Sequence, residues 1–399
     1  MTLPDPVTLR FAIAHRHDDP RLLALQAARY PDVDMPAALA QIAGRQAART
    51  KLPSWAELDD IVYPPRLPLE QCSSEATARY KAGLTEGDTL ADLTGGFGVD
   101  CAFMARRFRQ ATYVERQAGL CRLAERNFAA LGLANIDVLN RDGVEYLERI
   151  RPVDTIYLDP ARRDGHGGKV VAMADCEPDV ARLEPLLLRK GGRTLVKLSP
   201  MLDLALATRT LGHVAGAHVV SVAGECKELL LLLTPGADIP PDDLPIHCAI
   251  INTKGTQTFS FNRRQEREAR RAYTDTIGRY LYEPDASLLK AGAFHTLADT
   301  YGLAKLHPNS HLYTADSLSD RFPGRSFRVL DTCAPGKREV KAALGDLRQA
   351  NLTIRNFPAT VVELRHRLKL ADGGNTYLFA TTTSDGRRIF IHCERSSSQ

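Results

Sequence analysis

The sequence predicts an α/β fold with a Rossmann-like, mostly parallel sheet, preceded by a helical segment and followed by an α+β region. Two observations predict the sheet. Between about residues 89 and 200, short apolar segments alternate with helical ones, as they do where crossover helices join parallel strands. Two further apolar segments, 218–223 and 228–234, are separated by only a short turn, so they must form an antiparallel hairpin. A dehydrogenase-type sheet lacks such a terminal hairpin.

Each predicted strand is a short apolar run bounded by polar or turn-forming residues. The five strands before the hairpin are 89–93, 111–115, 136–139, 155–158 and 193–198. The helices between them include 99–107, 118–130 and 178–188. Before the sheet, residues 8–58 lack strand alternation and are expected to be helical. Another helix is expected at about 69–82, after the proline-rich linker 63–68.

A second proline-rich stretch, 234–241, marks a domain boundary. Beyond it the pattern becomes α+β, with short strands expected at 248–252, 327–330, 361–363, 377–382 and 388–392. The sequence therefore predicts a helical region 1–62, a sheet domain 63–238, and α+β domains at 239–325 and 326–399.

Composition sets limits on compartment and partners. The 399 residues carry a formal net charge of only +4, which permits nucleic-acid binding without requiring it. The 8 cysteines are scattered singly, so no zinc or other metal site is expected. The chain shows no signal peptide and no long uncharged apolar stretch. We therefore expect a cytoplasmic protein with free thiols and no membrane partner; the oligomeric state stays open.

A glycine-rich turn follows the first predicted strand and opens a helix. Glycines at this place let the backbone approach a ligand closely, and the helix directs its N-terminal amides at that ligand. Asp92 precedes the glycines, and Glu115 ends the second strand, where an acid can accept ribose hydroxyls. A carboxylate at Asp92 suits the ammonium group of a methionine moiety, so the pattern predicts S-adenosylmethionine. The expected cofactor-binding residues are Asp92, Thr94, Gly95, Gly96, Gly98, Glu115, Arg116, Asp142 and Gly143.

The same residues argue against a nicotinamide site. The nicotinamide fingerprint needs a third glycine, and counting from Gly96 that position is Cys101. Asp92 would also repel a pyrophosphate. An ordinary turn with glycines kept for packing stays open as an alternative. Asp142 and Gly143, after the third strand, either reach the adenine amino group or form a simple turn.

The fourth strand ends in Asp159-Pro160-Ala161-Arg162-Arg163, at the carboxyl edge where open α/β sheets bind ligands. This resembles the Asp/Asn-Pro-Pro-aromatic motif of methyltransferases that modify amino groups of bases or glutamine. The resemblance implies that Asp159 and the carbonyl of Pro160 accept hydrogen bonds from the target amino group, so that positioning is the main catalytic device. Arg162 replaces the stacking aromatic, and an arginine plane can still stack on a base.

Three further residues near this strand have open roles. The sequence also resembles the Asp-Pro-Pro-Arg signature of uridine C5 methyltransferases, but no cysteine follows the fifth strand. Cys226 lies between the last two predicted strands and is the alternative nucleophile, although a buried free thiol is commoner. Arg163 is expected to bind substrate. Lys197 either contacts a phosphate or simply ends its strand.

Several segments together resemble a known family. They are 70–81, 92–100, 159–163 and 225–230, with 280–287, 290–292, 322–325 and 373–379 in the C-terminal half. The chain is identified as a member of the bacterial class I S-adenosylmethionine-dependent methyltransferases with C-terminal ferredoxin-like (239–325) and THUMP-like (326–399) domains. Because THUMP modules bind RNA, the resemblance implies an RNA methyltransferase acting on tRNA or rRNA. THUMP enzymes usually carry the module at the N-terminus, whereas here it is C-terminal.

Charge patterning adds a candidate RNA surface. Arg263, Arg267 and Arg270, with two neighbouring arginines, are spaced so that one helix would gather them on one face. A one-sided arginine stripe fits a phosphate backbone, and a solvated helix face is the alternative. The main prediction is RNA methylation on a base amino group. A protein or small-molecule methyltransferase, or an RNA-binding protein with a silent methyltransferase fold, are the alternatives.

Overall fold

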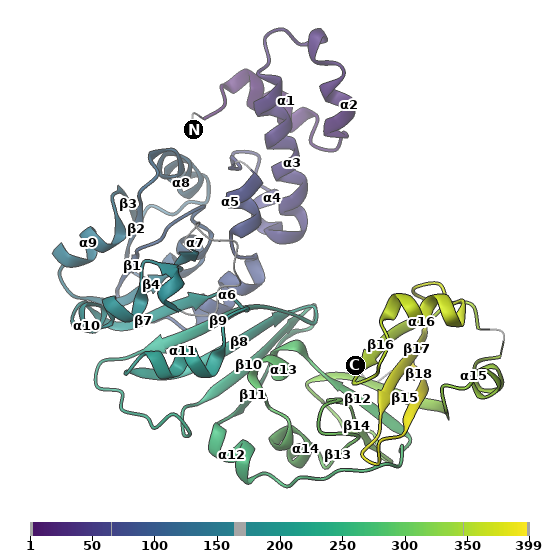
Figure 1. The fold of residues 1–399 in the computed structure, drawn as a ribbon. Coiled ribbons are helices and arrows are strands. Elements are labelled where there is room, and N and C mark those ends of the chain that lie inside the picture. Colours follow the sequence, from purple (N-terminus) through teal and green to yellow (C-terminus); the bar gives the residue numbers. More distant parts are fainter. Residues whose placement is uncertain (1–2, 65, 163–172, 346, 397–399) are drawn as a thin grey trace. The chain divides into compact units, whose positions relative to one another are not determined.

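The computed structural model describes residues 3–64, 66–162, 173–345 and 347–396, and it forms two compact units (Figure 1). The first unit comprises Met1–Ala217 and Glu228–Ile239, and the second comprises His218–Lys227 and Pro240–Gln399. Among the described residues, no helix has the length and apolar character needed to cross a membrane.

The first unit is built on the predicted sheet. Its strands run in the order β3-β2-β1-β4-β7-β9-β8, and the chain passes into the second unit at His218 of β8 and returns at Glu228 of β9. The neighbours among β3, β2, β1, β4 and β7 pair in parallel, and β7 pairs with β9 antiparallel. This confirms a parallel sheet closed by the antiparallel hairpin. The bounds are β1 Thr89–Asp92, β2 Gln110–Glu115, β3 Ile136–Asn140, β4 Val153–Leu158, β7 Gly191–Leu198, β8 Val214–Val222 and β9 Glu225–Leu233.

Strand register brings the ends of the central strands together. Asp92, the last residue of β1, lies opposite Tyr113 of β2 and Tyr157 of β4. Both tyrosines are fully buried, so this end of the sheet is anchored in the core. The residues that follow these three strands therefore meet at one edge. The connecting helices are α7 Val99–Ala105, α8 Ala118–Ala130, α9 Gly143–Arg149, α10 Val180–Lys190 and α11 Leu204–Thr210, and a short ladder joins β5 Ala161–Arg162 with β6 Cys176–Glu177.

The N-terminal region is helical, as predicted. Its helices are α1 Pro6–Ala14, α2 Pro20–Ala24, α3 Met35–Lys51, α4 Pro53–Ala56, α5 Arg66–Gln71 and α6 Glu75–Gly83, with a 3-10 turn at Ala27–Arg29. The single helix expected at 69–82 is wrong, because residues 72–74 are not helical and separate α5 from α6. Ser74 caps α6, its Oγ accepting from the Thr77 amide at 3.3 Å. A serine competes with the helical backbone for such bonds, which is why it starts a helix instead of continuing one.

The second unit contains a β-hairpin and a seven-stranded sheet. The hairpin is formed by β10 Ile246–Asn252 and β11 Gly255–Phe261. The sheet runs β13-β14-β12-β15-β18-β17-β16, and Leu281, Phe327, Phe379 and Ile391 form part of its core. The strands are β12 Tyr280–Pro284, β13 Ala304–Lys305, β14 Tyr313–Ala315, β15 Gly324–Cys333, β16 Asn351–Arg355, β17 Thr376–Thr382 and β18 Arg388–Arg395; the helices are α12 Arg263–Glu268, α13 Ala286–Ala291, α14 His295–Tyr301, α15 Lys337–Leu344 and α16 Val361–Leu368.

The strand predicted at 361–363 is wrong, because these residues begin helix α16. Thr360 and Glu363 form a capping box, in which Thr360 Oγ1 accepts from the Glu363 amide at 3.2 Å and Glu363 Oε2 accepts from the Thr360 amide at 2.7 Å. The two β-branched valines suggested a strand, but Val362 is 76% exposed. Local capping therefore outweighs the weak strand propensity of two residues.

The predicted arginine stripe does not lie on one helix face. Helix α12 ends at Glu268, and Ala269 leaves the helical conformation with ψ 144°. Arg270 therefore lies outside the helix that was to carry it. Arg267 pairs with Asp242 at 2.7 Å, and Arg264 binds Asp243 through two nitrogens. These cations are already compensated, so the stripe does not form the free basic face that the spacing indicated.

Candidate functional site

The glycine turn after β1 is shaped by close packing as well as by backbone conformation. Gly96 and Gly98 have φ angles of 55° and 85°, which favour glycine. At Gly95 an added Cβ would lie 2.2 Å from the ring of Tyr113, so no side chain fits there. Gly98 caps the start of α7. The turn therefore presents bare backbone beside the first turn of a helix, as a close-fitting ligand site requires.

Asp92 lies at the end of β1 with its carboxyl group almost completely buried. Its Oδ1 accepts from the Thr94 amide at 3.0 Å. Burial raises the pKa of Asp92 well above its usual value, although that hydrogen bond acts in the opposite direction. A cation bound next to such a buried carboxyl group stabilises its charged form. Asp92 therefore fits the ammonium group of an amino-acid ligand.

Glu115 is oriented by the backbone on both sides of its strand end. Oε2 accepts from the Gly96 amide at 3.0 Å, and Oε1 accepts from the Gln117 amide at 2.8 Å. A carboxylate has further lone pairs on each oxygen, so it can also accept from hydroxyl groups. Glu115 thus links the second strand to the glycine turn and fits the predicted ribose contact.

Asp142 and Gly143 lie where β3 leads into α9. Asp142 caps α9, with Oδ1 accepting from the amides of Val144 and Glu145. An added Cβ at Gly143 would lie 2.1 Å from the Leu93 carbonyl oxygen, so this turn packs directly against the end of β1. The local contacts of Asp142 are therefore those of a turn that caps a helix. A contact between Asp142 and adenine stays a prediction.

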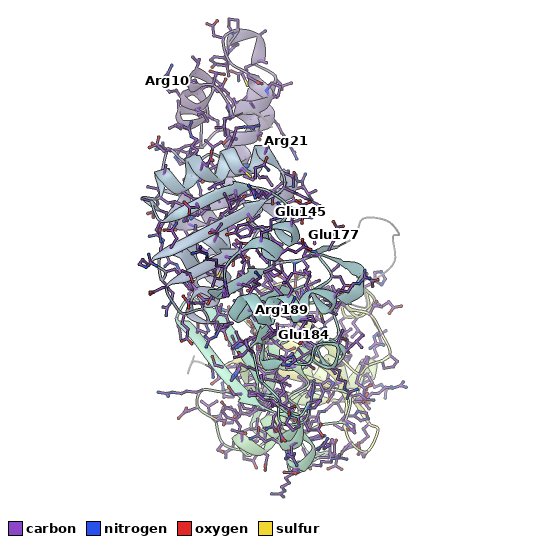
Figure 2. All side chains as sticks on the ribbon, turned by 90° about the vertical axis from the view of Figure 1, so that its left-hand side faces the viewer. Arg10, Arg21, Glu145, Glu177, Glu184 and Arg189 are labelled. Atoms are coloured by element: carbon purple, nitrogen blue, oxygen red, sulfur yellow. The ribbon has the colours of Figure 1, made fainter. Side chains whose placement is uncertain are left out.

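Arg116 follows Glu115 and was also predicted to bind cofactor. Its guanidinium pairs with Glu177 of β6 at 3.1 Å (Glu177 is labelled in Figure 2), and 64% of the arginine side chain is exposed. This surface pair gives Arg116 a partner on another strand. Its role toward a cofactor stays a prediction.

Asp159 is held at the end of β4 by two residues from neighbouring strand ends. Its backbone amide donates to Thr94 Oγ1 at 2.7 Å, and its Oδ2 accepts from Lys197 Nζ at 2.5 Å. The Asp159 side chain is 35% exposed and that of Lys197 is 13% exposed. The structure thus brings together three predicted residues from three places in the sequence. Pro160 follows directly, whereas the side chain of Arg162 and all of Arg163 lie outside the described residues.

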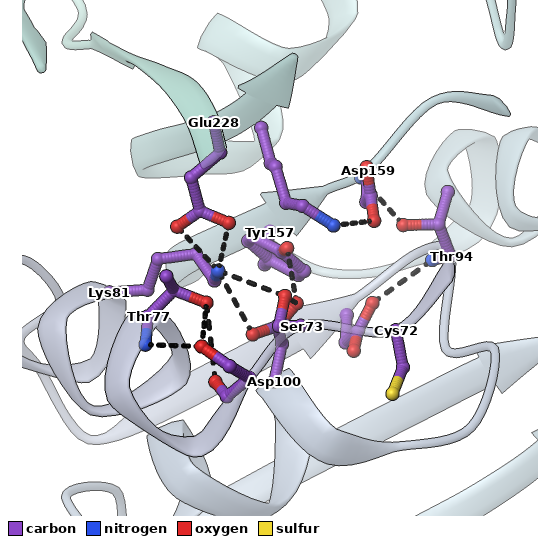
Figure 3. A network of polar contacts seen from close by, with 12 residues as sticks. Cys72, Ser73, Thr77, Lys81, Thr94, Asp100, Tyr157, Asp159 and Glu228 are labelled. Carbon is purple, nitrogen blue, oxygen red and sulfur yellow. Dashed lines mark hydrogen bonds and ion pairs between the residues drawn. The ribbon is translucent and has the colours of Figure 1, made fainter. Parts of the chain in front are cut away.

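A buried network of charged side chains lies beside this pair, and it was not predicted from the sequence (Figure 3). Lys81 of α6 is completely buried and donates to both oxygens of Glu228 of β9, at 2.7 and 2.8 Å. The same ammonium donates to Ser73 Oγ at 3.0 Å and lies 3.2 Å from Asp100 Oδ1. Asp100 Oδ2 accepts from Ser73 Oγ and from the Tyr157 hydroxyl, each at 2.7 Å.

The charges in this network influence one another strongly. Burial alone would raise the pKa of Asp100, yet the ammonium groups of Lys81 and Lys197 lower it below its usual value. Burial raises the pKa of Glu228, against the effect of the same two lysines. Burial acts to lower the pKa of Lys197, but the carboxylates of Asp159, Asp100 and Glu228 raise it above the usual value. Lys197 is therefore held as a cation.

Two other sequence hypotheses concern cysteine and metal. Cys226 lies within β9 rather than in the turn before it. Cys72, in the break before α6, is a second thiol near the network, and burial raises its pKa to about 11. A thiol with such a pKa is a poor nucleophile at neutral pH. Among the described residues, no three His, Cys, Asp or Glu side chains are grouped as metal ligands.

Comparison with known proteins agrees with the fold. The family model of protein-L-isoaspartate(D-aspartate) O-methyltransferases matches residues 71–164. A ferredoxin-like domain model matches 280–323, and a THUMP domain-like model matches 324–395. The glycine turn, Asp92 and Glu115 fit the methionine and ribose parts of S-adenosylmethionine. Together these features define a class I S-adenosylmethionine-dependent methyltransferase.

Individual relatives identify the family. A crystal structure of a candidate methyltransferase from Porphyromonas gingivalis W83 is 37% identical, with a TM-score of 0.88, over 99% of this chain and 100% of that one. A Mycobacterium tuberculosis protein named as an S-adenosylmethionine-dependent methyltransferase is 27% identical over 76% of this chain and 79% of its own length. A Jannaschia protein-L-isoaspartate O-methyltransferase is 35% identical over 20% of this chain and 36% of its own length. The chain belongs to the methyltransferase family with C-terminal ferredoxin-like and THUMP-like domains.

Proposed function

We propose that the protein methylates an amino nitrogen of a base in RNA. The observation that carries this proposal is the position of Asp159, whose partly exposed carboxylate ends β4 beside Thr94 and Lys197. A carboxylate there can accept a hydrogen bond from a target amino group and orient its nitrogen lone pair. S-adenosylmethionine supplies the electrophilic methyl group: the C–S bond breaks as the N–C bond forms, and its electron pair stays on sulfur.

The C-terminal half supports RNA as the class of substrate. Residues 324–395 match a THUMP domain-like model, and the helices of that region carry exposed cations. Lys337, Arg338 and Lys341 are exposed on α15, and Arg367 is exposed on α16. Unlike Arg267, neither Arg338 nor Lys341 forms an ion pair with a carboxylate in the described part of the chain. We propose that these side chains contact RNA phosphates, a role first predicted for Arg263, Arg267 and Arg270.

The methyl acceptor can be tested with the full chain. Radiolabelled S-adenosylmethionine is incubated with bulk bacterial RNA and, separately, with bulk protein. We expect label in RNA, and we expect Asp159→Ala to abolish transfer while the calorimetric affinity for S-adenosylmethionine is kept. Label in protein alone, or full turnover by Asp159→Ala, would contradict the proposal.

The RNA surface is tested by charge reversal and salt dependence. Each lost phosphate contact reduces the slope of log K against log salt by roughly 0.7–0.9. Arg338→Glu with Lys341→Glu should weaken RNA binding and flatten that slope, whereas cofactor affinity stays unchanged. Arg267→Glu is the matched control, because Asp242 already compensates that arginine and the loss should be smaller. Equal RNA affinity for all variants in filter binding would argue against this surface.

A protein carboxyl group is the second candidate acceptor. The match of residues 71–164 to a family of protein carboxyl methyltransferases favours it, and the Lys197 ammonium could hold a carboxylate. The same match covers mainly the cofactor half of the sheet domain, which related methyltransferases share whatever their acceptor. The acceptor is therefore better judged from the residues at the ends of β4 and β7.

A further inference from the structure

The pair formed by Asp159 and Lys197 offers an acceptor and a donor side by side. Asp159 Oδ2 and Lys197 Nζ are 2.5 Å apart, and the carboxylate is the more exposed partner. Each group can form further hydrogen bonds, because a carboxylate accepts them at two oxygens and an ammonium has three N–H donors. A planar substrate group can therefore engage both partners at once, through two neighbouring atoms of its own edge.

The carboxylates of the buried network keep Lys197 protonated when a substrate binds to Asp159. The Asp100 and Glu228 carboxylates, together with that of Asp159, raise the pKa of Lys197. Asp100 and Glu228 are themselves fixed by Lys81, with Ser73 and Tyr157 as further donors to Asp100. The ammonium of Lys197 therefore does not depend on Asp159 alone. It remains a positioned donor at the edge of the site.

We infer that Asp159 and Lys197 together recognise a substrate group in which an N–H donor lies next to a hydrogen-bond acceptor. Asp159 accepts from the N–H of the nitrogen to be methylated, and Lys197 donates to the neighbouring ring nitrogen or carbonyl oxygen. Nucleobase edges and carboxamides have this arrangement. The inference rests on the proposed amino-nitrogen chemistry and makes Lys197 a residue that determines specificity.

The same pair disfavours other acceptors. A carboxylate has no N–H for Asp159, and its charge would lie beside another carboxylate, which is unfavourable at short range. An alkylammonium such as a lysine side chain lacks the acceptor that Lys197 needs and brings a second positive charge next to it. Of these acceptor classes, only the neutral donor–acceptor edge satisfies both members of the pair without a like-charge contact.

The inference is tested by the chemistry of the transferred methyl group and by variants of Lys197. Full-length protein transfers radiolabel from S-adenosylmethionine to bulk RNA and to bulk protein, and the products are treated with mild alkali. Methyl esters release volatile methanol, whereas N-methyl groups stay bound. We expect alkali-stable label, recovered as N-methyl nucleosides after digestion of the RNA. Alkali-labile label would overturn the inference.

Lys197→Met should lower kcat/KM for RNA by about 10- to 100-fold, because a charged hydrogen bond to the substrate is lost. Lys197→Arg keeps a cationic donor and should fall between this variant and the wild type. Both should bind S-adenosylmethionine with unchanged affinity by calorimetry. Lys227→Met is the matched control, since that lysine is exposed on β9 and pairs with Glu225. Wild-type turnover by Lys197→Met would overturn the inference.

One outcome separates this inference from the proposed function. Alkali-stable label on protein carboxamides, with none on RNA, would refute the RNA substrate and support the donor–acceptor pair.

If Lys197→Met does not fold, Asp159→Asn tests the acceptor half of the pair, because its amide oxygen can still accept a hydrogen bond from the substrate N–H. That variant should exceed Asp159→Ala in turnover by about 10-fold or more. Equal loss in the two variants would count against the pair.

Discussion

Removal of the buried Lys81 ammonium should strongly destabilise the first unit. Lys81 is completely buried, and its Nζ donates to two oxygens of Glu228 and to Ser73 while lying 3.2 Å from Asp100. Lys81→Met has a side chain of similar length, so little cavity is created. It leaves two buried carboxylates without their main cation. Breaking a buried ion pair in this way costs about 3–5 kcal/mol.

The cost of Lys81→Met should depend on pH in a defined direction. Burial already raises the pKa of Glu228 in the folded protein, and loss of the ammonium raises it further. A carboxyl group with a raised folded pKa binds its proton more tightly when folded, so stability is lost as pH rises from the unfolded pKa through the folded pKa. The difference between variant and wild type should therefore be smaller near pH 5 than near pH 8.

Trp55 provides a local reporter for this measurement. It is the only tryptophan in the chain, it is 1% exposed, and it packs against Phe97 of the glycine turn at 5.2 Å between ring centres. Urea unfolding followed by its fluorescence gives the stability of the first unit. Lys227→Met serves as the control and should be nearly neutral. A loss below about 1 kcal/mol for Lys81→Met at pH 8 would refute the reasoning.

Two further predictions concern the cofactor. Glu115→Ala removes the proposed ribose acceptor and should weaken S-adenosylmethionine binding by on the order of 1–3 kcal/mol in calorimetry, and unchanged affinity in a folded variant would reject this placement. Because burial raises the pKa of Asp92, its carboxyl group can be protonated in the free protein, and the ammonium of the bound cofactor should displace that proton. Affinity should then rise with pH, with proton uptake by the buffer visible as a buffer-dependent enthalpy. Asp92→Asn should lose both effects.

The sheet of the first unit could be predicted because its signals are local. Apolar runs of strand length alternate with helical ones, and the turn between β8 and β9 is too short for anything but a hairpin. Asp92, Glu115 and Asp159 could be assigned to one candidate site for the same reason. Carboxyl ends of parallel strands meet at one edge, so residues that end consecutive strands come together without any knowledge of packing.

The errors arose where a local pattern was extended beyond its range. Two adjacent valines suggested a strand at 361–363, but the capping box of Thr360 and Glu363 starts a helix there. The arginine spacing assumed a helix longer than α12, which ends before Arg270. For α16, the hydrogen bonds of the capping box start the helix, and a periodicity rule does not register them.

The buried network was missed for a different reason. Lys81 and Glu228 are 147 residues apart, and each occupies a position where a charged side chain would ordinarily face solvent. A helix and a strand considered singly give no sign that both side chains point inward. The one signal was that 70–81 and 225–230 carry the family resemblance, although neither segment contains a cofactor motif.

Asp100 explains why those distant segments belong together. It lies in the first turn of α7, directly after the glycine turn, and accepts from Ser73 at the start of the α6 region. It also accepts from Tyr157, two residues before Asp159 on β4. One carboxylate therefore connects the glycine turn, the strand that leads into Asp159, and the segment that carries Lys81. Asp159 directly follows β4 in the chain, so the hydrogen bond from Tyr157 to Asp100 holds the end of the strand that leads into Asp159. The network consequently anchors the end of β4 directly before the Asp159–Lys197 pair.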